Sequence, residues 1–135
     1  MKDFRSLKVW AKAHALTLAI YMITRGFPKD ELYGLTSQMR RCAASVPSNL
    51  AEGCGRTGDN DFARFVEMAA SSALELEYQL LLSHDVEFID QPQYRELQTS
   101  AVEVKQMLAS LIKTLRGANG QRAVPAKPRR QSVQS

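Results

Sequence analysis

The sequence predicts an all-α protein, an antiparallel up-down-up-down four-helix bundle. Four segments carry apolar residues at helical spacing, and clusters of Gly, Pro and Asp separate them. No segment has the alternation of apolar and polar residues that is typical of a strand. The connections between the segments are only a few residues long, which favours antiparallel neighbours.

The composition fits one globular domain with a short tail. Of 135 residues, 44% are hydrophobic and 24% are charged, as in a soluble folded protein. We expect the bundle to occupy residues 1–117 and a basic, disordered tail to occupy residues 118–135. No apolar run approaches the roughly 20 residues that span a bilayer, and the N-terminus does not have the pattern of a signal peptide. We therefore expect a cytoplasmic protein.

The first predicted helix runs from Leu7 to about Arg25, where Gly26 and Pro28 stop it. It is apolar on two sides, so one side must face a partner outside the chain's own bundle. One stripe comprises Leu7, Ala11, His14, Leu18 and Met22, and the other comprises Val9, Ala13, Leu16, Ile20 and Ile23. From the second stripe we take as candidates for an interface between copies Val9, Leu16, Ile20 and Ile23.

The second predicted helix begins near Lys29 and ends at Gly53. Pro47 lies inside it, and because proline removes a backbone hydrogen bond we expect a kink or a break there. The glycines that follow spell G-x-G-x-x-G, the dinucleotide-binding pattern. That pattern requires a preceding strand, and here it follows a helix, so we interpret it as helix termination and a turn.

The third predicted helix opens at Asp59, Asn60 and Asp61, which are good capping residues, and runs to about Ser83. Its outer side adds interface candidates to those of the first helix, namely Leu74, Tyr78 and Leu81. The fourth helix follows Pro92 and carries apolar residues at spacings of three and four. We expect it to end at Gly117.

A polar stripe runs along the second helix at spacings of 4, 4, 3 and 4 residues. It consists of Arg41, Ser45, Asn49, Glu52 and Arg56. Such a row can hold a ligand or a phosphate backbone, or it can form a ladder of hydrogen bonds and ion pairs that fixes helix packing. We favour the ladder, because Asn is a poor choice inside a helix unless its amide has partners.

The sequence offers no catalytic, metal-binding or cofactor-binding constellation. Cys42 and Cys54 fall on one predicted helix about 18 Å apart, too far to pair, and their spacing fits no zinc motif. His14 and His84 have no nucleophile or metal ligand at a helical neighbour position. We therefore predict a protein that is not an enzyme.

Positive charge is concentrated at the C-terminus. The chain has 18 basic and 14 acidic residues, and the last 18 residues contain four of the basic ones and no acid. Residues 1–117 are thus neutral by count. The candidates for contact with nucleic acid are Arg122, Lys127, Arg129 and Arg130.

Three motifs carry a family resemblance: F-x-x-L-x-V-W near the start, F-P-x-x-E-x-Y-G-L at residues 27–35, and Q-M-R-R-C-A-A-S-V-P-S-N-L-A-E-G-C-G-R at residues 38–56. With F-x-x-x-A-x-S-S-A-L-E-L at residues 65–76, the sequence resembles the four-helix-bundle proteins of 23S ribosomal RNA intervening sequences. The resemblance covers about residues 4–115. It implies a bacterial protein that assembles as a ring-like homopentamer, in a family without an assigned biochemical role.

The resemblance leads to two hypotheses. The first is a homo-oligomer that associates with RNA or with a ribonucleoprotein such as the ribosome through its tails. The alternative is a protein-protein scaffold in which Arg40, Arg41 and Arg56 engage an acidic partner. A more distant relative, an accessory of the reverse transcriptase of diversity-generating retroelements, binds nucleic acid through a basic surface. The folded part of this chain departs from it by being neutral.

Overall fold

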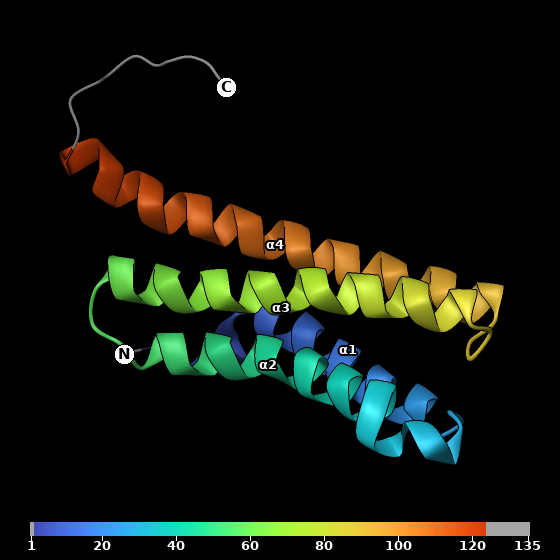
Figure 1. Ribbon diagram of the computed structural model, residues 1–135. Helices are drawn as coiled ribbons and strands as arrows, with labels where there is room; N and C mark the ends of the chain where they lie inside the picture. Colours follow the sequence, from blue (N-terminus) through green and yellow to red (C-terminus); the bar gives the residue numbers. More distant parts are fainter. Residues whose placement is uncertain (1, 124–135) are drawn as a thin grey trace.

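The computed structural model describes residues 2–123, with side chains described for residues 2–117, and within this range it consists of helices joined by short turns (Figure 1). The four long helices are α1 (Lys8–Thr24), α2 (Ser37–Cys54), α3 (Asp59–Asp85) and α4 (Gln91–Ala123). A 3₁₀ turn (Phe4–Ser6) precedes α1. A second 3₁₀ turn (Lys29–Glu31) and a π-helical turn (Leu32–Thr36) connect α1 to α2. The described residues contain no strand, so the all-α prediction is confirmed there.

Long-range hydrogen bonds establish that successive helices are antiparallel. Between α1 and α2, Thr17 Oγ1 lies 3.0 Å from the Ala43 carbonyl oxygen, and Thr24 Oγ1 accepts from Arg40 Nε at 2.8 Å. Between α3 and α4, ion pairs join Glu77 to Lys105 and Glu67 to Arg116. Between α2 and α3, Ser83 Oγ lies 3.3 Å from Met39 Sδ, and Ser72 Oγ lies 2.8 Å from Ser45 Oγ. In all three pairs of helices, residues later on one helix contact residues earlier on the other. This is the predicted up-down-up-down order.

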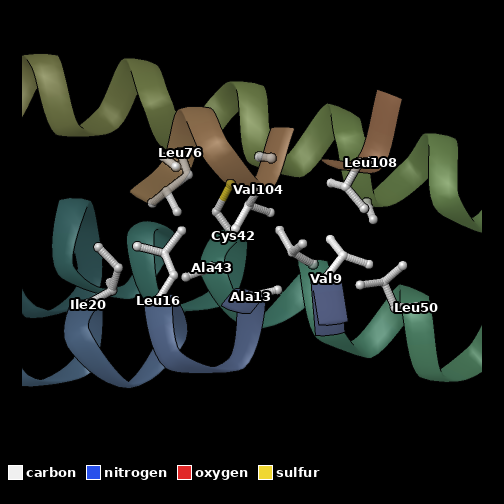
Figure 2. Close-up of a cluster of buried hydrophobic side chains, with 14 of the residues drawn as sticks. Val9, Ala13, Leu16, Ile20, Cys42, Ala43, Leu50, Leu76, Val104 and Leu108 are labelled. Carbon is white, nitrogen blue, oxygen red and sulfur yellow. The ribbon is translucent and has the colours of Figure 1, made fainter. Parts of the chain in front are cut away.

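The core is a continuous column of apolar side chains from all four helices (Figure 2). Leu50, Leu76 and Leu108 are completely buried within it. Helix α1 contributes one side of its surface, and its residues in the core are Val9, Ala13, Leu16 and Ile20.

This burial corrects one prediction. Val9, Leu16 and Ile20 were expected at an interface between copies, but they lie in the core of the single chain. Ile23, the fourth candidate of that stripe, is half-buried and packs against the core. The helix turns its other stripe outward, because α2 and α4 cover the side of Ile20. Leu18 and Met22 are 53% and 59% exposed.

The break in the second helical segment lies at Gly34 and not at Pro47. Helix α2 runs through the buried Pro47 without interruption. Gly34 has φ −113° and ψ −112°, outside the helical region. A Cβ atom at Gly34 would lie 2.9 Å from Oε1 of Glu31, the same oxygen that accepts a hydrogen bond from the Leu35 N–H at 3.1 Å. The Glu31 side chain thus stabilises the turn at Gly34. A larger residue at position 34 would displace the Glu31 carboxylate from its hydrogen bond with Leu35.

Two further helix ends differ from the prediction. Gly58 is the N-cap of α3, with φ +87°, and no side chain caps the helix. Asp59 and Asp61 lie instead in its first turn, where the helix dipole favours negative charge. Helix α4 continues past Gly117 and Gly120 to Ala123, because a glycine weakens a helix without necessarily ending it.

Candidate interaction surfaces

The polar stripe of α2 lies at the edge of the contact between α2 and α3. Ser45 Oγ is 2.8 Å from Ser72 Oγ on α3, and either hydroxyl can donate. Asn49 Nδ2 donates to the carbonyl oxygen of Ser45 at 2.9 Å and to its Oγ at 3.0 Å. The asparagine therefore has the partners that its place in a helix requires. This part of the stripe fixes how α2 and α3 pack.

The two ends of the stripe are more exposed. Arg56 forms an ion pair with Glu52 at 2.8 Å, and its guanidinium lies 4.7 Å from the centre of the Phe65 ring. Arg41 forms no hydrogen bond or ion pair within residues 2–117. The predicted ladder is therefore present as hydrogen bonds from Asn49 to Ser45 and as an ion pair between Glu52 and Arg56. It does not include Arg41.

Arg40, one of three arginines of the scaffold hypothesis, is used inside the bundle. Its Nε donates to Thr24 Oγ1, and its guanidinium lies 5.0 Å from the centre of the Tyr21 ring. Arg41, by contrast, is exposed and forms no ion pair with any described side chain. It lines a shallow polar groove between α2 and α3 together with Ser45, Ser72 and Glu75.

Cys42 lies at the floor of that groove. Its Sγ donates to the Ser72 carbonyl oxygen at 3.0 Å. Burial, together with the nearby Glu75 carboxylate, raises the pKa of the Cys42 thiol to about 12. Burial also raises the pKa of Cys54. Both thiols are therefore protonated at neutral pH, which is the opposite of the environment that activates a cysteine.

No group of three or more His, Cys, Asp or Glu side chains within residues 2–117 is placed to hold a metal ion. His14 stacks on Trp10, with 5.0 Å between ring centres, and His84 stacks on Tyr94 at 4.6 Å.

No helix in the described part of the chain is both long and apolar enough to cross a membrane.

Two apolar faces remain exposed, on α1 and on α3. On α3, the predicted interface residues Leu74, Tyr78 and Leu81 lie opposite the core, and Tyr78 is 61% exposed. On α1, the exposed face consists of Leu18 and Met22, with Ala11 and Ala15 on the preceding turns. The sequence predicted that α1 has two apolar stripes, and this face belongs to the first of them. The sequence did not predict which stripe faces the core and which faces outward.

The α1 face borders a groove of about 460 Å³ between α1 and α4. Ala15, Ala19 and Met22 line it on one side, and Leu97 and Val104 on the other. The wall formed by α4 also carries Glu96 and Glu103, and Glu103 pairs with Lys12 at 3.1 Å. The groove is thus apolar at its floor and charged at its rim.

The basic candidates near the C-terminus lie at the limit of the structure. Arg122 belongs to the last turn of α4, and its side chain is not described. Lys127, Arg129 and Arg130 lie outside the described residues.

The comparison with known families identifies the bundle. The model of the family described as 23S rRNA-intervening sequence protein matches residues 5–110, which include α1, α2 and α3 and the part of α4 up to residue 110. The chain belongs to this family. The matched residues contain both the polar stripe of α2 and the exposed faces of α1 and α3 of this 23S rRNA-intervening sequence protein.

A solved structure agrees with this assignment. The chain is similar to a protein of unknown function from the S23 ribosomal protein family of Bacteroides thetaiotaomicron VPI-5482, with a TM-score of 0.71 and 25% identity. The likeness covers 78% of this chain and 98% of the other. No curated protein matches the sequence.

Proposed function

We propose that this member of the 23S rRNA-intervening sequence protein family is a non-enzymatic homo-oligomer of the bacterial cytoplasm that associates with RNA or a ribonucleoprotein. The observation that carries the proposal is the pair of exposed apolar faces on opposite sides of one small bundle. Leu18 and Met22 on α1, and Leu74 and Tyr78 on α3, are each more than half exposed. Apolar side chains that cluster on a surface mark a protein contact.

The proposed assembly is a ring of five copies, as the family resemblance implies. Each copy carries four basic residues and no acid in residues 118–135. Five copies would bring together about twenty positive charges, and such clustering converts weak individual contacts with a polyanion into a stronger one.

The test of self-association is the mass of the purified full-length chain by light scattering over a range of concentrations. We expect a mass several times the 15.1 kDa of one chain, and about five times for the proposed ring. A single chain in solution at all concentrations would overturn the proposal.

The test of RNA contact is the affinity for a structured RNA as a function of salt. We expect that ending the chain at Ala123, which removes Lys127, Arg129 and Arg130 but keeps α4, weakens binding and reduces the salt dependence. The matched control replaces these three residues by Gln in the full-length chain. An unchanged affinity in both variants would exclude a role for the tail.

The second candidate function is a protein-protein scaffold without nucleic-acid contact. It is favoured by Arg41, whose guanidinium is exposed and unpaired beside the polar groove of α2 and α3. Capture of a protein partner by the form that ends at Ala123, and its loss with Arg41→Gln, would support the scaffold over the RNA-binding function.

A further inference from the structure

The two exposed apolar faces differ in charge. Helix α1 contains Lys8, Lys12 and His14 and no acidic residue. Helix α3 contains six acidic residues and one arginine, Arg64. The face on α1 therefore belongs to a basic helix, and the face on α3 belongs to an acidic one.

The difference persists after ion pairs within the chain are taken into account. On α1, Lys12 is paired with Glu103, while Lys8 and Arg25 form no ion pair within residues 2–117. On α3, Asp61, Glu67 and Glu77 are paired with basic residues. The acids that remain beside the apolar residues are Glu75 and Asp85. Glu75 accepts a hydrogen bond from Gln79 at 3.4 Å and lines the groove of α2 and α3 with Arg41, but it forms no ion pair within residues 2–117. The described ionic neighbour of Asp85 is His84 at 3.6 Å.

The unpaired charges lie on or beside the apolar faces. Arg25 follows Met22 by three residues and Leu18 by seven, and Lys8 precedes Ala11 by three, so each cation shares the exposed side of α1. On α3, Asp85 follows Leu81 by four residues and Tyr78 by seven, and Glu75 precedes Tyr78 by three. All four charged side chains are exposed.

We infer that the α1 face of one copy docks against the α3 face of the next copy, with Lys8 and Arg25 meeting Glu75 and Asp85. This inference rests on the proposed self-association and names the contact that produces it. Pairing of α1 with α1 would bring Lys8 and Arg25 against each other, and pairing of α3 with α3 would do the same for Glu75 and Asp85. Like charges across an interface oppose association, so both symmetric pairings are disfavoured.

The shapes of the two surfaces agree with this pairing. The α1 face borders the groove of about 460 Å³ between α1 and α4, whereas Leu74, Tyr78 and Leu81 project from the outer side of α3. Glu96 on the α4 wall forms no ion pair within residues 2–117 and would repel the acids of α3, which places the contact along α1. A contact between two different faces leaves one face of each kind free on every pair of copies, so further copies can add. The assembly is a closed ring when the rotation between neighbouring copies closes, as in the proposed ring of five.

Charge reversal tests the inference. One variant carries Lys8→Glu and Arg25→Glu, and a second carries Glu75→Lys and Asp85→Lys. We expect each variant alone to associate roughly tenfold more weakly or worse, because like charges then face each other in every contact. Mixing the two variants is expected to raise the mass by light scattering well above that of either variant alone, because each offers the other a matched face. A ring with an odd number of copies cannot alternate the two variants completely, so the mixed assembly need not reach the wild-type mass.

The control is a chain with Lys29→Glu and Lys113→Glu, which reverses two exposed cations that lie outside α1 and α3 and is expected to keep the wild-type mass. A wild-type chain that is itself a monomer would overturn the proposed function. A wild-type oligomer whose mass is unaffected by the Glu75 and Asp85 reversals, or two variants that fail to restore assembly on mixing, would overturn this inference and leave self-association standing.

Discussion

Replacing Ile20 by Asp is expected to unfold the bundle, whereas replacing Leu18 by Asp is expected to leave it folded. Ile20 is completely buried and Leu18 is 53% exposed, although they are two residues apart on the same helix. An unpaired carboxylate in an apolar core costs several kcal/mol, in addition to the lost apolar burial, and a domain of this size has only about 5–15 kcal/mol of stability.

The measurement is thermal unfolding followed by circular dichroism at 222 nm. We expect Ile20→Asp to have little cooperative transition. We expect Leu18→Asp to keep the wild-type helix content and a cooperative transition, at a melting temperature lowered only by the loss of assembly. Should Ile20→Asp keep the helix content and melting temperature of the wild type but lose mass, Ile20 would belong to an interface after all.

Replacing Gly53 by Ala is expected to destabilise the bundle by about 1–3 kcal/mol, the usual cost of an added carbon in a packed site. Gly53 is buried in the last turn of α2, against Phe62 and Phe65 near the start of α3. A Cβ atom there would lie 2.8 Å from Cδ1 of Phe62 and 3.0 Å from Cβ of Phe65. The Cβ of Phe65 is fixed to its backbone, so α2 and α3 must move apart to admit the new atom.

The matched control is Gly55→Ala, two residues later. Gly55 is exposed with φ −83°, and its nearest neighbour to a new Cβ is the Glu52 carbonyl oxygen at 3.5 Å, an ordinary contact. We expect the free energy of unfolding in urea to change by no more than about 0.5 kcal/mol for this variant. Equal stability of the two variants would contradict the close approach of α2 and α3 at Gly53.

Local patterns were enough to predict the helices and part of the polar stripe. The four helices follow from apolar spacing and from Gly and Pro at their ends, which depend only on residues within one or two turns. The contacts of Ser45 with Asn49 and of Glu52 with Arg56 were equally accessible, because residues four apart on a helix are neighbours.

Partners distant in sequence could not be predicted in this way. Ser72, which meets Ser45, is 27 residues away, and Thr24, which accepts from Arg40, is 16 residues away. The same holds for the break at Gly34. Proline is the strongest local signal for a break, but the bundle keeps α2 continuous through Pro47 and turns the chain where the Glu31 carboxylate supports Gly34.

The sequence by itself determined that this chain forms four antiparallel helices and that α1 and α3 each carry more apolar surface than one core can cover. Only the tertiary structure decided which stripe of α1 faces inward. The two stripes have similar composition, so no local energy separates them, and the choice depends on how α2 and α4 close over the side that holds Ile20. That choice leaves Leu18 and Met22 exposed, and it places the basic face of α1 and the acidic face of α3 on the outside of the bundle.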